Sequence, residues 1–268
     1  MATQAHREPD APTPGDGYVQ SFARGLGVIR SFSAEARVQT LSEVAARSGL
    51  TRAGARRILL TLQSLGYVHS DGKLFRLTPR ILELGFAYLT ALPIWNLAEP
   101  VMERLSAAVG ESCSAAVLDG SDIVYVLRVH THKIVSINLN VGTRLPAYCT
   151  SMGRVLLAGL GDGEVKQRLK ASELRANTRH TITDAGELLA RVQQVRRQGW
   201  ALVNQELEEG LISIAAPVKN RAGATVAALN VSGQANRTSA TVMKDTLLPA
   251  LRAAADEVSA LLASLGRD

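Results

Sequence analysis

The chain has little of several features that would otherwise define its class. It holds only two cysteines, Cys113 and Cys149, in 268 residues. Two cysteines cannot form the disulfide framework of a small secreted domain, so a reducing cytoplasmic setting is favoured. Aromatic residues make up 4% of the chain, which disfavours the stacked aromatic platform that binds single-stranded nucleic acids. Apolar runs stay below the ~18 residues of a membrane-spanning helix.

The first residues, MATQAHREPDAPTPGDG, also lack the apolar segment of a secretory signal peptide. They are polar and rich in proline and glycine, so we expect a disordered leader over residues 1–17. The rest of the chain is well supplied with apolar side chains, since hydrophobic residues form 46% of the whole. A chain of this length is expected to form two domains.

Positive charge is concentrated near the N-terminus. The formal net charge is +6, and residues 18–92 alone carry ten basic and four acidic side chains. The remaining 176 residues after this segment are nearly balanced, with 19 basic and 17 acidic side chains. The basic excess therefore belongs to one small module and indicates the part of the chain that meets a polyanion.

Two short helices are predicted inside this module. Thr40 and Glu43 have the spacing of a capping box, and Gly49 is placed to end that helix in the left-handed conformation. Thr51 is placed to cap the next helix, which Gly66 ends. This second helix has an apolar stripe formed by Ala55, Ile58, Leu59, Leu62 and Leu65. Two helices joined by a short glycine-containing turn are typical of a helix-turn-helix.

A β-hairpin is predicted directly after these helices, in YVHSDGKLFRL. Asp71-Gly72 is a strong two-residue turn signal, and pairing across it places Val68 opposite Phe75 and Tyr67 opposite Arg76. Helices followed by such a hairpin form a winged helix-turn-helix, which we place at residues 18–78.

The basic face of the second helix favours duplex DNA as the partner, because one helix fits the major groove and an arginine fork matches guanine. We expect arginines of this helix to contact base edges or phosphates, and basic wing residues to contact the backbone. The alternative is an ordinary helical pair whose arginines are simply solvated. The candidate DNA-binding residues are Thr40, Thr51, Arg52, Ala53, Arg56, Arg57, Lys73 and Arg76.

Residues 79–95 are predicted to form a linker helix, with Thr78 as its cap and Pro79 in its first turn. Its apolar residues are too many for an isolated exposed helix. Packing on its own domain is one explanation. Packing against a second copy is favoured, because a dimer reads two half-sites ~10 bp apart.

Residues 96–268 alternate between strand and helix patterns and predict an antiparallel sheet flanked by helices, an α+β domain. The expected elements include a hairpin turning near Asp119–Asp122, a strand over KIVSINLN, a helix capped at Thr183 and ended by Gly199, and a long final helix. Two late strands are expected to be joined around Asn220–Gly223.

Catalytic and metal sites are poorly supported in this domain. His130 and His132 have a spacing compatible with metal binding, but no further histidine or cysteine cluster completes a site. Cys149 precedes a helix without a patterned histidine partner, so a packed or pocket-lining thiol is favoured over a nucleophile. We therefore expect no enzyme, no metal and no cofactor.

A binding pocket has more support. Thr150 or Ser151 caps a short helix, 151–160, whose free amides favour an anion. Ser213, Asn230 and Ser232 lie on late strands, and neutral hydroxyls and amides beside a helix N-terminus suit a small carboxylate. Purely structural caps and strand ends explain these residues equally well.

The order of these parts, with the segment GTRLPAYCTSMGRVLLA, resembles the IclR family of bacterial transcription regulators, and within it the PcaR/PcaU/PobR group of aromatic-acid catabolism. The resemblance implies a winged helix-turn-helix, a linker helix and a GAF/profilin-like effector domain. It also implies homodimers that pair through the N-terminal modules, or dimer-of-dimers tetramers, and an effector such as 4-hydroxybenzoate, protocatechuate or β-ketoadipate.

The resemblance also implies where the effector binds. The loop-helix segment and the late strands form the pocket, with two residues at its mouth. The implied residues are Arg144, Tyr148, Ser151, Met152, Gly153, Val203, Asn204, Ser213, Asn230 and Ser232. A non-aromatic organic acid as effector, an effector-independent DNA-binding protein and a Cys149-dependent enzyme are the competing hypotheses.

Overall fold

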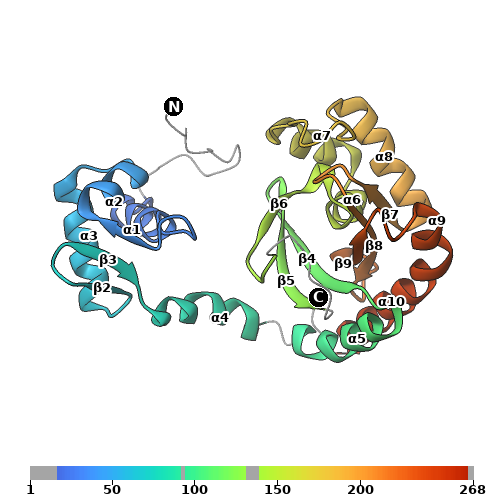
Figure 1. Ribbon diagram of the computed structural model, residues 1–268, viewed down its shortest axis with the longest axis horizontal. Helices are drawn as coiled ribbons and strands as arrows, with labels where there is room; N and C mark the ends of the chain where they lie inside the picture. Colours follow the sequence, from blue (N-terminus) through green and yellow to red (C-terminus); the bar gives the residue numbers. More distant parts are fainter. Residues whose placement is uncertain (1–16, 92–93, 131–138, 265–268) are drawn as a thin grey trace. The chain divides into compact units, whose positions relative to one another are not determined.

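The computed structural model describes residues 17–91, 94–130 and 139–264. The chain divides into two compact units, with the boundary after Ala91 (Figure 1). No helix in the described ranges is long and apolar enough to cross a membrane.

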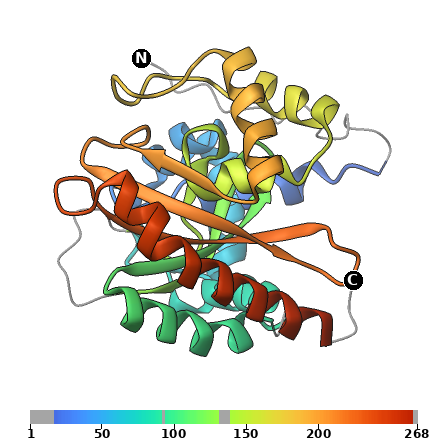
Figure 2. The same cartoon turned by 90° about the vertical axis from the view of Figure 1, so that its right-hand side faces the viewer.

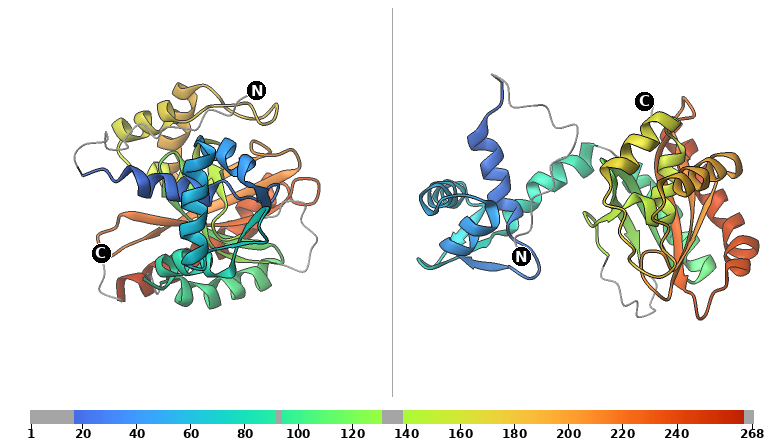
Figure 3. Two further views of the ribbon diagram at one scale, coloured as in Figure 1. Left: turned by 90° about the vertical axis from the view of Figure 1, so that its left-hand side faces the viewer. Right: turned by 90° about the horizontal axis from the view of Figure 1, so that it is seen from above.

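The N-terminal unit is a small helical core with a short sheet, in which three helices gather around one set of apolar side chains (Figure 3). Strand β3 lies between β1 and β2, and both pairings are antiparallel. The elements are α1 (Gln20–Arg30), β1 (Val38–Thr40), α2 (Leu41–Ser48), α3 (Arg52–Ser64), β2 (Val68–Ser70), β3 (Leu74–Leu77), η1 (Pro79–Ile81) and α4 (Leu82–Ala91).

Local capping explains where these helices begin and end. The Thr40 hydroxyl accepts from the Glu43 amide, the Glu43 carboxylate accepts from the Thr40 amide, and Gly49 follows α2 with φ 66°. The Thr51 hydroxyl accepts from the Gly54 amide at 3.1 Å. The predicted capping box, glycine stop and second cap are therefore confirmed.

The predicted register of the wing was wrong by two residues. Val68 pairs with Leu77, and Ser70 pairs with Phe75. The cause is Asp71, whose carboxylate accepts from the amides of Lys73 and Leu74 at 3.0 and 2.8 Å and so widens the turn. Because a shift of two residues preserves the face of each side chain, Val68 and Phe75 still enter the core.

The C-terminal unit is a six-stranded antiparallel sheet in the order β6-β5-β4-β9-β8-β7. The predicted α+β class is confirmed. Its elements are α5 (Ile94–Val109), β4 (Ser112–Asp119), β5 (Asp122–Val129), β6 (Arg144–Pro146), η2 (Ala147–Cys149), α6 (Ser151–Ala158), α7 (Asp162–Ala171), α8 (Ala185–Gln198), β7 (Ala201–Asn204), β8 (Leu211–Lys219), β9 (Thr225–Gln234), α9 (Ala240–Val242), η3 (Met243–Leu247, one turn of π-helix) and α10 (Leu248–Ser264).

Helices cover both faces of this sheet. α5 and α10 lie side by side across one face (Figure 2). α6 packs on the other face against β4, β8 and β9, and α8 packs behind α6. The small side chains of Ala116, Ala215 and Ala228 leave room for α6 to approach the strands, and this approach places the α6 N-terminus over the sheet.

The predicted elements of the C-terminal unit agree with the structure in part. The hairpin turning at Asp119–Asp122 is confirmed. Thr183 was the wrong cap, because the Asp184 carboxylate accepts from the Glu187 amide at 2.7 Å. The prediction missed α7. The strand expected over KIVSINLN falls mostly outside the described residues.

Candidate functional sites

The outward face of α3 carries arginines. Ala55, Leu59 and Leu62 are buried, and this one stripe holds the helix in the core. Arg52, Ala53, Arg56 and Arg57 are exposed. Within the described ranges, no carboxylate forms a salt bridge with these three guanidinium groups, and α3 itself contains no acidic residue. The helix therefore presents uncompensated positive charge to solvent.

The wing adds two exposed cations beside this helix. Lys73 lies in the turn, and Arg76 on β3 lies opposite His69, on the face away from the buried Phe75. Alternation along the strand produces this arrangement, because successive side chains point to opposite faces.

The two threonines predicted to contact DNA are occupied by their helices. The Thr40 hydroxyl both accepts from the Glu43 amide and donates to the Glu43 carboxylate. The Thr51 hydroxyl holds the Gly54 amide. Each side chain has a structural role that positions α2 or α3, whereas the three arginine side chains have no hydrogen-bond partner in the described part of the chain.

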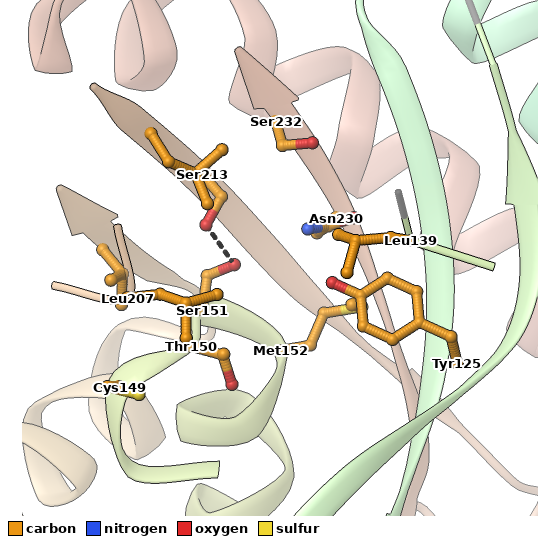
Figure 4. Close-up of a pocket in the computed structure, with 12 residues that line it drawn as sticks. Tyr125, Leu139, Cys149, Thr150, Ser151, Met152, Leu207, Ser213, Asn230 and Ser232 are labelled. Atoms are coloured by element: carbon orange, nitrogen blue, oxygen red, sulfur yellow. Dashed lines mark hydrogen bonds between the residues drawn. The ribbon is translucent and has the colours of Figure 1, made fainter. Parts of the chain in front are cut away.

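A pocket lies between the N-terminus of α6 and the sheet (Figure 4). None of the described lining residues is charged. They come from η2 and α6 on one side and from the strands and the β7–β8 connection on the other. The lining residues are Tyr125, Leu139, Cys149, Thr150, Ser151, Met152, Val203, Leu207, Leu211, Ser213, Asn230 and Ser232.

The α6 side of the pocket has hydroxyls and amides. The Thr150 hydroxyl accepts from the Gly153 amide at 3.2 Å and donates to the Pro146 carbonyl. The amides of Ser151 and Met152 lie in the first turn of α6, where backbone amides have no intrahelical acceptor. The Ser213 hydroxyl donates to the Ser151 hydroxyl at 2.9 Å, a bond drawn in Figure 4. This end of the pocket is suited to a carboxylate oxygen.

The sheet side of the pocket has an amide and a phenol. Asn230 is 5% exposed, and its Oδ1 has no hydrogen-bond partner among the described residues. Figure 4 shows the Asn230 amide nitrogen and the Tyr125 hydroxyl turned toward the same space. Burial raises the pKa of Tyr125 to about 12, with a smaller opposing effect of Arg128. The phenol therefore stays protonated at neutral pH and acts as a donor.

Cys149 lines the pocket as a thiol and not as a nucleophile. Burial raises its pKa to about 12, and the Asn177 amide donates to its sulfur at 3.4 Å. A reactive cysteine requires a lowered pKa, so the geometry disfavours a Cys149-dependent enzyme. Among the described residues no cluster suited to a metal ion is found, and His132 lies outside them.

The structure brings six of the ten predicted effector residues to the pocket: Ser151, Met152, Val203, Ser213, Asn230 and Ser232. The other four do not line it.

Two of these four belong to other interactions. Arg144 forms salt bridges with Asp119 and Asp122 on the exposed side of the hairpin, and the Tyr148 hydroxyl donates to the Arg175 carbonyl at 2.7 Å.

Gly153 and Asn204 are excluded for different reasons. A Cβ at Gly153 would lie 2.2 Å from the Ala147 carbonyl oxygen, so its role is to allow α6 to touch the preceding turn. Asn204 is exposed because the buried Val203 takes the inward position on β7. Alternation along the strand is enough to separate the two, because successive side chains point to opposite faces.

Sequence reasoning missed a buried ion pair beside the pocket. Arg154 donates to both carboxylate oxygens of Glu206 at 2.8 and 2.6 Å, and its Nε donates to the Tyr148 carbonyl at 3.1 Å. The two side chains are 5% and 8% exposed. Arg154 therefore joins α6, η2 and the β7–β8 connection, which carries the pocket residue Leu207.

Comparison with known proteins identifies the family of both units. Residues 86–260 match the family model of the bacterial transcriptional regulator IclR C-terminal domain, and residues 21–72 match the IclR helix-turn-helix domain. The chain is 43% identical to the Pca regulon regulatory protein of Pseudomonas putida over 242 residues, which cover 90% of this chain and 83% of that protein.

Two further relatives connect the fold to aromatic acids. The p-hydroxybenzoate hydroxylase transcriptional activator of Acinetobacter baylyi is 34% identical, and the match covers 96% of this chain and 97% of that protein. The crystal structure of an IclR homolog from Microbacterium hydrocarbonoxydans, complexed with 4-hydroxybenzoate, superposes with a TM-score of 0.80. It is 26% identical, with 91% of this chain and 99% of that chain covered.

Proposed function

Since the chain belongs to the IclR family of bacterial transcriptional regulators, we propose that α3 and the wing read operator DNA and that the pocket beside α6 binds a small aromatic acid. Family membership makes the protein a DNA-binding transcriptional regulator and not an enzyme. The proposed modules are residues 18–78 for DNA, 79–95 for the linker and 96–268 for the effector. A regulator of chromosomal DNA acts in the cytoplasm, where we place it.

The exposed arginine face of α3 carries the DNA-binding proposal. Arg52, Arg56 and Arg57 have no described counter-ion, so each can pair with a phosphate or a guanine edge. Lys73 and Arg76 extend the same charge along the wing. A bidentate arginine–guanine contact contributes roughly 1–3 kcal/mol of discrimination.

The test replaces Arg52, Arg56 and Arg57 together by alanine and measures operator binding by fluorescence anisotropy. The matched control replaces Arg191, Arg197 and Arg252, three exposed arginines of the C-terminal unit. We expect the α3 variant to lose operator affinity by two orders of magnitude or more, and the control to lose far less. Equal losses in both variants would show that only net charge matters and would reject the assignment.

Exposed apolar side chains on α1 and α4 support a dimer. Phe22 on α1 is 68% exposed, and Leu82 and Leu84 on α4 are 70% and 51% exposed. Burial of such residues is favourable by ~25 cal/mol per Å² of apolar surface, and a second copy of the N-terminal unit supplies a matching face. A dimer also presents two α3 helices to two half-sites.

Sedimentation of a Leu82→Glu, Leu84→Glu variant tests the dimer, with Val226→Glu as a matched control at an apolar position that is 39% exposed in the other unit. The first variant is expected to sediment as a monomer, and the control as an oligomer. A wild-type monomer at micromolar concentration contradicts this proposal.

The neutral donors of the pocket support a carboxylate effector of the aromatic-acid class. Ser151 and Ser213 offer hydroxyls near the first amides of α6, and Tyr125, Asn230 and Ser232 offer further polar groups in the lining. The solved relative that holds 4-hydroxybenzoate has the same fold. 4-Hydroxybenzoate and protocatechuate, with a polar group at each end of a ring, suit such a pocket.

A thermal-shift screen of aromatic acids tests this assignment, because a ligand at ~100 times its dissociation constant stabilises the folded state by ~2.7 kcal/mol. Regulation requires in addition that the effector bind the free and the operator-bound protein unequally. Effector affinity measured with and without operator DNA should therefore differ. Identical values would leave a ligand-binding protein that does not regulate.

A further inference from the structure

An arginine stands on the same face of the sheet as the pocket. In the register of the sheet, Ser114 on β4 lies opposite Arg128 on β5 and opposite Asn230 on β9. Residues directly opposite each other in antiparallel strands project from the same face. Since Asn230 lines the pocket, Arg128 projects from the pocket face.

The guanidinium of Arg128 reaches toward the pocket across β4. Its Nη1 donates to the Ser114 hydroxyl at 3.1 Å, which places the charge above β4. Neighbouring strands are ~4.8 Å apart, so the charge stands about one strand spacing from β9 and Asn230. The charge of Arg128 also acts on the pocket residue Tyr125, because it opposes the rise in the pKa of the phenol.

Arg128 differs from the other hydrogen-bonded arginines of this sheet and its α6 side. Arg144, Arg154, Arg168 and Arg196 each donate to a carboxylate. Among the described residues, the partners of Arg128 are neutral atoms, the Ser114 hydroxyl and His130 Nδ1.

This charge is also partly removed from water. Arg128 is half-buried, and burial lowers its pKa, although a guanidinium remains charged at neutral pH. A half-buried cation without a described counter-ion lies beside a pocket whose described lining is uncharged.

We propose that Arg128 is the counter-ion of the effector and makes the pocket select anionic over neutral ligands. The inference rests on the proposed effector function of the pocket and adds a specificity-determining residue outside its lining. The hydroxyls and amides of the lining position the ligand, whereas Arg128 supplies the charge that distinguishes a carboxylate from the amide of the same shape.

The experiment measures dissociation constants by calorimetry for wild type and Arg128→Gln. The probes are 4-hydroxybenzoate, 3-hydroxybenzoate and protocatechuate, together with the primary amide of whichever acid binds most tightly. We expect wild type to prefer the acid over its amide, and Arg128→Gln to lose roughly 10- to 100-fold of acid affinity with little change for the amide. Arg128→Lys, which keeps the charge, should retain the preference.

Arg104→Gln is the matched control, because Arg104 pairs with Glu257 on the exposed side of α5. It should bind acid and amide as wild type does. If Arg128→Gln does not fold, Ser114→Ala removes the hydroxyl that holds the guanidinium, and the preference for the acid should fall several-fold.

Two outcomes separate the two proposals. Wild type that binds none of the acids rejects the proposed effector. Wild type that binds an acid, with an unchanged acid-to-amide ratio in Arg128→Gln, overturns the role of Arg128 alone.

Discussion

The Arg154–Glu206 pair joins three segments of the effector unit, and breaking it is expected to destabilise that unit strongly. Replacing Arg154 by methionine leaves the Glu206 carboxylate 8% exposed without its bidentate partner. It also removes the donor to the Tyr148 carbonyl. Removal of one member of a buried ion pair costs about 3–5 kcal/mol.

The partner substitution and the double variant complete a thermodynamic cycle. Glu206→Met leaves the buried Arg154 guanidinium without its carboxylate partner, and we expect a loss of stability of similar size. The double variant removes both charges and replaces them with side chains of comparable length. Its cost should be well below the sum of the two single costs, because no uncompensated charge remains in the interior.

The protein carries a built-in probe for this measurement. Its two tryptophans, Trp95 and Trp200, both lie in the C-terminal unit, so tryptophan fluorescence during urea unfolding reports that unit alone. A loss of 3–5 kcal/mol corresponds to a fall in melting temperature of roughly 6–20 °C. Single variants that cost less than ~1 kcal/mol, or a strictly additive double variant, would refute the reasoning.

Two further predictions concern the same region. Gly153→Ala places a Cβ 2.2 Å from the Ala147 carbonyl oxygen, so α6 must shift, and the affinity for the acid measured by calorimetry should fall at least tenfold. The control Gly163→Ala, where space is open, should leave this affinity unchanged. The pKa of the Cys149 thiol is raised to about 12, so its neutral form is the one the fold favours. The stability that this group contributes is present below pH ~9 and is lost as the pH rises toward 12. The midpoints of urea unfolding at pH 8 and pH 10.5 should therefore differ less in Cys149→Ser than in wild type. An equal difference in both proteins contradicts the raised pKa of Cys149.

Signals that act within a few residues could be predicted from the sequence. The capping box of Thr40 and Glu43, the left-handed Gly49 and the apolar stripe of α3 all follow from local chemistry. The wing register could not, because the Asp71 carboxylate competes with a two-residue turn by binding two amides. A dipeptide signal predicts that a turn exists more reliably than it predicts the length of that turn.

The pocket required long-range information. A β-bulge between Ala115 and Ala116 shifts the pairing with β5, so that Tyr125 and Arg128, three residues apart, both face the pocket side. Simple alternation would have separated them. Arg154 and Glu206 are 52 residues apart, and only the packing of α6 on the sheet brings them together.

The contact between Gly153 and the turn before it limits how this receptor can be retuned. Position 153 accepts no side chain, so a biosensor engineer gains little by randomising it. The hydroxyls on β8 and β9, by contrast, can be enlarged or trimmed one at a time. New ligand shapes should therefore be selected from libraries at Ser213 and Ser232, with Gly153 left as it is.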